Sequence, residues 1–456
     1  MQDVNVELSQ SSTGVVSLND ANVRSLFEVL SGTISLSDGY GKPSNWFSTI
    51  TGGTGSSSGA YSGVAVDSSG NIYGIIENSG TGSNAGILVK QNSSGSLEWA
   101  VQFPDSSFVL TGVVVDSMNN NDVVVSGNYY AGSTPIGFLA RFNSLGQGLW
   151  QTDFYIPGDH LVSLNSIAID SAGSVYGAGV GFDTDDDEYY GLVVKCTSAG
   201  GLSFKNGYKS TTPGEFVSFA CVCVNNTPAA VYVGGTYSYY YNPLILKMGF
   251  DGSELGSGYI NEDFYIDYSV KSIALDDFGS VYLSATALPV NGETQGFLCK
   301  FTSGLSIDWS QLIPYVITGI SSSGGSVNVS CNTSSDTILF IKYTTGGSIF
   351  FARSLSALGG VYTPTGGGSR SYAYGNNFYI PMSNADRPVI FKAPTDGSLI
   401  GTYTPFTYSA VSIGGGGATG TMSSLSHTFS SISTLSSAGG IPSVNFVSLT
   451  NLLTPM

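Results

Sequence analysis

The sequence predicts an all-β protein that folds as a seven-bladed β-propeller with four antiparallel strands in each blade. Three observations carry this prediction: a composition rich in glycine and poor in charge, a strand pattern that repeats about every 50 residues, and one basic residue at the same place in every repeat. With 61 glycines, 27 tyrosines and only 10% charged residues, the composition favours strands and turns over helices.

The clearest copy of the repeat covers residues 62–103. Apolar runs alternate with turns, and the turns at 68–71 and 93–96 are tight, whereas the connection between the second and third strands is long. The same wording returns at 167–176 and 273–282, with weaker copies from residues 113 and 223 and decayed copies around 326 and 377. A four-stranded meander of this length cannot bury both faces alone, so the copies are expected to close into a ring.

The number of blades follows from the third strand, which ends its apolar run in one basic residue in each copy. These residues are Lys90, Arg141, Lys195, Lys247, Lys300, Lys342 and Lys392, at successive spacings of 51, 54, 52, 53, 42 and 50. Seven copies predict seven blades. We interpret the basic side chains as structural, lying along their own blades with their charged ends in water.

The fourth strands supply a large aromatic residue at matching places, namely Trp99, Trp150, Phe204, Trp309 and Phe350. Two further segments could provide the strand that closes the ring against the last blade. One is residues 45–50, before the first copy, and the other is residues 399–403, after the last. The sequence does not choose between them, and the propeller is assigned to residues 45–405.

The sequence of the repeat resembles that of a β-propeller repeat family. The family pattern is apolar-Asp-x-x-Gly-x-apolar-Tyr, followed by apolar-Lys and, after a turn that contains Gly, apolar-Trp. Copies one, three and five match this pattern, as in Ile167-Ala168-Ile169-Asp170-Ser171-Ala172-Gly173-Ser174-Val175-Tyr176. Copies four, six and seven lack the Asp-x-x-Gly part. The resemblance supports the same fold as the repeat period does.

Residues 1–44 do not fit the repeat and are expected to form a small α+β module. Val4, Val6 and Leu8 alternate as in a strand, and a helix with an apolar face is expected between Asp20 and Gly32. One segment resembles part of the tail and tail-fibre proteins of tailed bacteriophages. It runs from Val16-Ser17-Leu18-Asn19-Asp20 to Ser35-Leu36-Ser37-Asp38-Gly39-Tyr40-Gly41-Lys42. This chain has Gly39 where those proteins usually have an apolar or aromatic residue.

This resemblance covers about 30 residues. It implies a virion protein of the tail, made in the host cytoplasm, whose residues 1–44 dock to other tail proteins and which forms a homo-oligomer. The C-terminal segment, residues 406–456, belongs to a stretch from Gly397 to the end without any Asp, Glu, Lys or Arg. Such a segment is poorly solvated alone, so we expect it to pack on the propeller or on another subunit.

The net negative charge of the chain argues against some classes of binding partner. A net charge of −17 repels phosphate backbones and anionic headgroups, which argues against nucleic acid. No run of about 18 apolar residues occurs, so no membrane insertion is expected, and the first residues lack the pattern of a secretory signal. The five cysteines lie in strand-like segments and are expected to be buried thiols in a reducing compartment.

The candidate recognition face carries the long connections, because loops on a rigid scaffold commonly bind partners. Three consecutive copies place tyrosines there: Tyr129, Tyr130, Tyr189, Tyr190, Tyr237, Tyr239, Tyr240 and Tyr241. Exposed tyrosines stack on sugars and donate hydrogen bonds, so a host surface glycan or protein receptor is the expected ligand. The alternative is that these rings only pack the loops against one another.

An acidic stretch in the third copy suggests a weak cation site. Asp183, Asp185 and Asp187 have the alternating spacing that opens calcium loops. The glycine and the distal glutamate of such loops are missing from their places, so a solvated acidic loop is the alternative. Calcium is therefore the one cofactor that the sequence suggests.

No catalytic constellation is visible, and the chain is expected not to be an enzyme. His160 and His427 are the only histidines and have no neighbouring ligand residues. One alternative function is a scaffold subunit of the tail, baseplate or head surface. Another is a polysaccharide depolymerase that uses loop carboxylates such as Glu215, Glu262 and Asp263, which would have to converge in three dimensions.

Overall fold

The computed structural model divides the chain into two units, residues 1–45 and 46–456. The residues that it describes are 47–49, 59–78, 86–103, 107–132, 134–155, 161–183, 188–210, 214–237, 241–261, 265–289, 293–333, 337–357, 362–363, 371–384, 387–397, 401–403, 406–411, 416–417, 421–423, 427–431, 436–440 and 447–448. The expected α+β module at residues 1–44 lies outside them.

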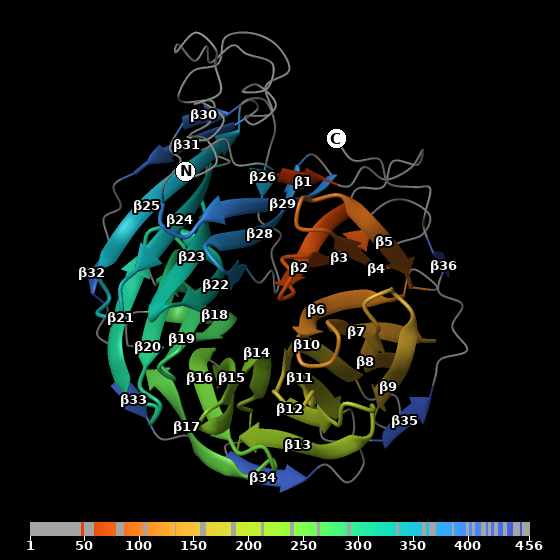
Figure 1. The fold of residues 1–456 in the computed structure, drawn as a ribbon. Coiled ribbons are helices and arrows are strands. Elements are labelled where there is room, and N and C mark those ends of the chain that lie inside the picture. Colours follow the sequence, from red (N-terminus) through yellow and green to blue (C-terminus); the bar gives the residue numbers. More distant parts are fainter. Residues whose placement is uncertain are drawn as a thin grey trace, which may run out of the picture. The chain divides into compact units, whose positions relative to one another are not determined.

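The described residues form a seven-bladed β-propeller of four-stranded antiparallel blades, as the repeat predicts, and contain no helix (Figure 1). The strands of blades one to three, from the central axis outward, are β2 (Gly59–Val66), β3 (Ile72–Asn78), β4 (Ile87–Gln91) and β5 (Leu97–Gln102); β6 (Val109–Asp116), β7 (Asp122–Ala131), β8 (Thr134–Phe142) and β9 (Gly148–Tyr155); β10 (Leu161–Ile169), β11 (Val175–Asp183), β12 (Glu188–Cys196) and β13 (Leu202–Ser210).

Blades four to six follow the same order. Their strands are β14 (Val217–Asn226), β15 (Ala229–Tyr237), β16 (Asn242–Met248) and β17 (Glu254–Asn261); β18 (Tyr265–Leu275), β19 (Val281–Pro289), β20 (Gln295–Phe301) and β21 (Ile307–Ile313); β22 (Val316–Ser323), β23 (Ser326–Asn332), β24 (Thr337–Tyr343) and β25 (Ile349–Ala357).

The N-terminal strand closes the ring. In blade seven, the short strands β26 (Tyr362–Thr363) and β27 (Tyr372–Tyr374) both pair with β28 (Asn377–Asn384), which pairs with β29 (Arg387–Pro394). The outer strand of this blade is β1 (Phe47–Thr49), antiparallel to β29 with Phe47 opposite Phe391. Of the two candidates from the sequence, the segment before the first copy is therefore the closing strand.

The C-terminal segment runs back around the outside of the ring and adds one strand or more to six blades (Figure 1). Blade six gains two strands, and blades five to one gain one each. These strands are β30 (Gly401–Tyr403), β31 (Phe406–Ala410), β32 (Gly416–Gly417), β33 (Thr421–Ser423), β34 (His427–Ser431), β35 (Ser436–Gly440) and β36 (Val447–Ser448). We call β31–β36 the outer belt. Of the two expected partners of this segment, the structure pairs it with the propeller.

The Asp-x-x-Gly-x-apolar-Tyr motif stabilises a turn within each blade that contains it. Asp67 follows β2, and its carboxylate accepts hydrogen bonds from the backbone amides of Ser69 and Asn71, both at 2.9 Å, and from the hydroxyl of Tyr73 at 3.3 Å. The turn needs a residue at positive φ, which Gly70 supplies at 81°. Asp170 and Asp276 hold the corresponding turns of blades three and five in the same way.

Six of the seven basic side chains tie neighbouring blades together. Lys195, for example, lies 4.9 Å from the ring centre of Tyr176 in its own blade and donates to the carbonyl of Phe250 in the next blade at 2.8 Å. In six blades a basic side chain reaches such a carbonyl, from Lys90, Arg141, Lys195, Lys247, Lys300 and Lys342. These contacts agree with the structural interpretation. The expectation that the charged ends lie in water is wrong for Lys90, Arg141 and Lys300, which are buried, whereas the other four basic residues are partly exposed.

The fourth-strand aromatics support the same contact. The indole nitrogens of Trp99, Trp150 and Trp309 donate to the carbonyls of Ser144, Ser198 and Thr345 at 2.9–3.0 Å. In blade six the residue opposite Lys342 is Phe351, not Phe350, which corrects the alignment made from the sequence. The bulge after the basic residue is the same as in blades one, two, three and five, and Phe351 keeps their spacing of nine residues from basic residue to aromatic residue.

Apolar clusters fill the spaces between blades, and all five cysteines are free thiols. Cys196, Cys221, Cys299 and Cys331 are buried, as expected, and Cys223 is partly buried. Burial raises the pKa of Cys196 to about 12, so this thiol is protonated at neutral pH. Among the described residues, no helix is long and apolar enough to span a membrane.

Candidate functional site

The expected difference in loop length between the two faces holds only in part: in blade two, residues 132–133 alone join β7 to β8, whereas residues 117–121 join β6 to β7. We call the face with the turns between first and second strands and between third and fourth strands the short-turn face, and the opposite one the long-loop face. Three tyrosines of the long-loop face are exposed, one in each of blades two, three and four. Tyr130 is 55% exposed, Tyr189 48% and Tyr241 44%.

Three of the other predicted tyrosines pack inward. Tyr190 and Tyr237 are buried, contrary to the expected exposure, because each stands at a strand end whose side chain points into the space between blades. Tyr129 is half-buried and stacks on Phe108 with ring centres 4.6 Å apart. For these residues the alternative interpretation, loop packing, describes the geometry. Tyr239 and Tyr240 lie outside the described residues.

The buried tyrosines hold two carboxylates that the sequence analysis did not connect with them. The hydroxyl of Tyr129 donates to Asp153 at 3.2 Å, and the amide of Gln151 donates to the same carboxylate at 2.7 Å. Burial raises the pKa of Asp153 above its usual range, although both hydrogen bonds act to lower it. In blade four, the hydroxyl of Tyr237 donates to Glu215 at 2.5 Å, where Ser210 donates at 3.0 Å.

The tyrosines make the fold sensitive to alkaline pH. Burial, with the Asp153 carboxylate beside it, raises the pKa of Tyr129 to about 12, and burial raises that of Tyr379 to about 12. A tyrosine that ionises at about pH 10 when unfolded contributes stability below pH 10 that is lost as the pH rises through its folded value. We expect cooperative unfolding between about pH 10 and 12, followed by circular dichroism together with phenolate absorbance. Complete titration of the phenols near pH 10 with the fold intact would contradict this.

The predicted cation site is only partly within the described residues. Asp183 is the last residue of β11, and Asp185 and Asp187 lie outside the described range. No cluster of three or more potential ligand side chains occurs in the part of the chain that the structure describes. Calcium binding therefore stays a prediction. Glu262 and Asp263 also lie outside the described residues, so the carboxylates of the depolymerase alternative are not placed together.

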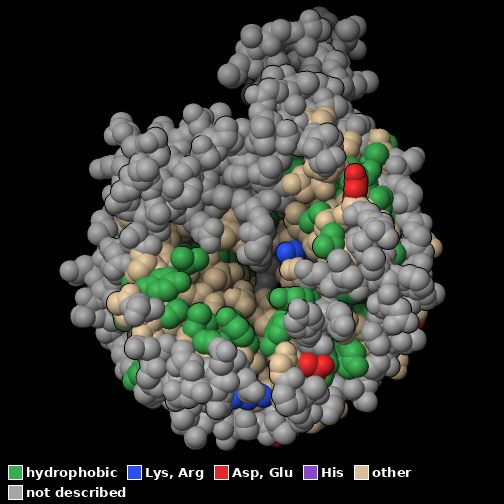
Figure 2. Space-filling model, turned by 180° about the vertical axis from the view of Figure 1, so that it is seen from behind, with side chains coloured by type: hydrophobic (Ala, Val, Ile, Leu, Met, Phe, Trp, Pro, Cys, Tyr) green, Lys and Arg blue, Asp and Glu red, His purple; other side chains and the backbone are tan. Residues whose placement is uncertain are grey.

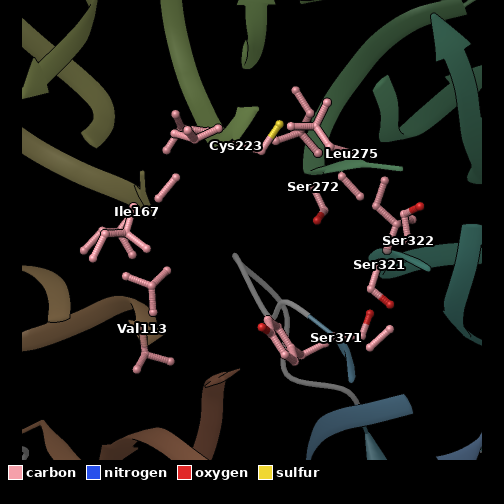
Figure 3. A pocket seen from close by; sticks show the side chains of 18 of the residues that line it. Val113, Ile167, Cys223, Ser272, Leu275, Ser321, Ser322 and Ser371 are labelled. Atoms are coloured by element: carbon pink, nitrogen blue, oxygen red, sulfur yellow. The ribbon is translucent and has the colours of Figure 1, made fainter. Parts of the chain in front are cut away.

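The central channel of the ring is lined mainly by aliphatic and serine residues and by backbone, without Asp, Glu, Lys or Arg among the lining residues. It encloses a cavity of about 410 Å³, lined by the inner strands of all seven blades. Val113, Ile167 and Leu275 face it from three blades, and the hydroxyls of Ser272, Ser321 and Ser371 gather on one side (Figure 3). One face of the molecule shows the central hollow, with apolar side chains around it and a basic side chain at its rim (Figure 2). The valines and isoleucines of this wall indicate close packing of the inner strands.

The comparisons with known proteins concern the fold. A scan against protein-family models and a search of curated proteins gave no match. Among solved structures, the β-propeller domain of the trilobed protease from Pyrococcus furiosus is 8% identical, with a TM-score of 0.38, over 65% of this chain and 95% of that one. Prolyl oligopeptidase B from Galerina marginata is 9% identical, with a TM-score of 0.42, over 78% of this chain and 52% of that one.

A third similar structure is an uncharacterized protein of Listeria monocytogenes, 6% identical with a TM-score of 0.37, over 73% of this chain and 88% of that one. This chain thus spans about half the length of the oligopeptidase. At such low identity the likeness is one of fold alone.

Proposed function

We propose that this chain is a structural component of a bacteriophage tail, in a fibre or at the tail tip, and that it binds the host cell surface through the long-loop face of its propeller. In this proposal residues 1–44 dock to other tail proteins of the virion, the chain acts as a homo-oligomer, and it is not an enzyme. The ligand is a surface glycan or a protein receptor.

The observation that carries the proposal is the row of Tyr130, Tyr189 and Tyr241, exposed on the same face of three consecutive blades. Tyr130 and Tyr189 belong to β-strands, and Tyr241 immediately precedes one, so the rings are presented by a rigid scaffold. A rigid aromatic ring with a hydroxyl binds sugars or proteins at low entropic cost. The virion assignment is supported by the resemblance of residues 16–42 to phage tail proteins.

The test is a triple substitution of these tyrosines by alanine in the virus. Truncation of an aromatic hot spot costs about 2 kcal/mol of binding or more, so we expect the adsorption rate to fall at least about tenfold. A matched control replaces Met118 and Leu145 by alanine. These side chains are 72% and 73% exposed on the short-turn face of blade two, and their loss should leave adsorption unchanged.

Other outcomes distinguish the alternatives. Normal adsorption by particles that incorporate the triple variant would contradict recognition through this face. Failure of particle assembly with adsorption retained would support the scaffold, and release of reducing sugar from host polysaccharide by the purified chain would support the depolymerase. Immunogold labelling of particles with antibody against residues 57–405 places the chain, and absence of label would remove the virion assignment.

A further inference from the structure

Blade six departs from the repeat at three positions that lie together on the short-turn face. Asn328 stands opposite Lys342, where five other blades have a tyrosine opposite the basic residue. The first turn is a two-residue hairpin, Gly324–Gly325, with Ser323 opposite Ser326; no aspartate of its own blade holds it, and the amide of Gly324 donates to Asp277 of blade five at 3.1 Å. Both glycines have positive φ, 57° and 74°. Blade six therefore lacks both the tyrosine opposite the basic residue and the turn aspartate that blades one, three and five have.

The third departure concerns charge. In blades one and five the bulged residue of the fourth strand is an acid that pairs with the basic side chain: Glu98 with Lys90 and Asp308 with Lys300, both at 2.9 Å. In blade six the bulged residue is Phe350, which is 62% exposed, and Lys342 lies 5.8 Å from its ring centre. An aromatic ring thus replaces the carboxylate beside the ammonium group.

Blade two also lacks the tyrosine, because Val124 stands opposite Arg141, but there the space is filled. The guanidinium of Arg141 is 3% exposed and pairs with Asp116 and Asp122. In blade six Asn328, which stands at the tyrosine position, borders a gap of only about 10 Å³, and a separate open cavity of about 300 Å³ is lined by residues 324–326, Lys342, Thr344, Thr345 and Phe350. Its volume lies at the lower end of the range for small-molecule sites, about 300–1,000 Å³.

The lining combines three kinds of contact. Phe350 offers an exposed flat ring, and Ser326, Thr344 and Thr345 contribute hydroxyl-bearing residues. Lys342 has three donors, of which one reaches the carbonyl of Thr395 at 2.9 Å. Burial lowers the pKa of Lys342, and Asp396 acts to raise it. Phe278, 78% exposed, packs over Gly325, where a Cβ would meet its ring at 2.6 Å, so a second aromatic ring borders the site.

We propose that this cavity of blade six binds a single sugar unit that carries a carboxylate, such as a uronic or sialic acid. The apolar face of the sugar stacks on Phe350, its hydroxyl groups bond to Ser326, Thr344 and Thr345, and its carboxylate takes the place beside Lys342 that Glu98 and Asp308 occupy in the sister blades. The site is on the face opposite the exposed tyrosines. It does not rest on the proposed role in adsorption.

The test is calorimetric titration of the purified full chain with D-glucuronate and with N-acetylneuraminate, against glucose as the neutral comparison. We expect a Kd on the order of 1 mM for at least one acid, as is usual for a single small contact surface, and at least fivefold weaker binding of glucose. Phe350→Asp restores the ion pair of blades one and five, so it is compatible with the fold and should weaken binding at least tenfold.

The matched control is Leu149→Asp, the same bulged position beside Arg141 in blade two, which should leave the titration unchanged. A second variant, Lys342→Met, removes the cation and should abolish the preference for acids over glucose. Absence of heat from both acids, or equal affinity in the folded Phe350→Asp protein, would overturn the proposal. Equal binding of glucose and glucuronate would overturn the role of the carboxylate.

Discussion

Truncation of the chain after Pro405 will lower the melting temperature and cause the propeller to self-associate. The outer belt pairs with the fourth strands of blades one to six, and its removal leaves those strands as open edges. Each lost backbone hydrogen bond costs about 0.5–1.5 kcal/mol, so the loss over six blades amounts to several kcal/mol. Each of these strands carries only one or two charged residues, such as Lys209 in β13 and Arg353 in β25, so the open edges can pair with other chains.

The measurement is thermal unfolding together with light scattering of residues 1–405 against the full chain. A shorter truncation, after Gly440, removes only β36, whose pairing with β5 covers Val447 and Ser448. It should therefore have a much smaller effect than the complete truncation. If residues 1–405 keep the oligomeric state and the melting temperature of the full chain, the belt contributes nothing to stability, and a role in contacts with other proteins would have to explain it.

Replacement of Arg141 by methionine will be among the most destabilising substitutions in the propeller. Arg141 pairs with Asp116, which is 2% exposed, and with Asp122 at 3.0 Å, and it donates to the carbonyl of Ser198 in blade three at 3.3 Å. Removal of one partner from a buried ion pair leaves an uncompensated charge and typically costs about 3–5 kcal/mol. The free energy of unfolding in urea measures this loss.

Lys300→Met is the matched control, because it removes the equivalent basic residue of blade five. Its partner Asp308 is 46% exposed and remains solvated, so the lost ion pair contributes about 0–1 kcal/mol. Adding Asp116→Leu to Arg141→Met should recover part of the stability, since no buried carboxylate is then left unpaired. Equal losses for Arg141→Met and Lys300→Met would show that burial of the pair does not matter.

The sequence predicts the repeating part of the fold well because the information is local. The Asp-x-x-Gly-x-apolar-Tyr wording encodes a turn whose aspartate, amides and tyrosine lie within six residues, as at Asp67 and Tyr73. The basic residue marks one position per copy, so the blades can be counted without any long-range contact. The free, mostly buried thiols also follow from local strand patterns.

The candidate sites were less predictable. Tyr189 and Tyr190 are adjacent in the sequence, yet Tyr189 is exposed and Tyr190 is buried. Successive side chains of a strand point in opposite directions, and only the packing of the blades decides which of them faces outward. The pairing of Tyr129 with Asp153, 24 residues apart, depends on the same packing. The cavity of blade six depends on which side chains of two turns and of β25 lie beside Lys342, and no sequence motif predicts this.

By itself, the sequence determined that this chain is an all-β ring of seven meanders, because each meander is specified within about 50 residues. The tertiary structure decided how the ring closes and how its edge is covered. Phe47 meets Phe391, and Val447 meets Gln102, across most of the chain. These pairings consist of backbone hydrogen bonds between segments that the closed ring brings together. Because backbone donors and acceptors are nearly the same in every residue, the sequence does not show which segments will pair.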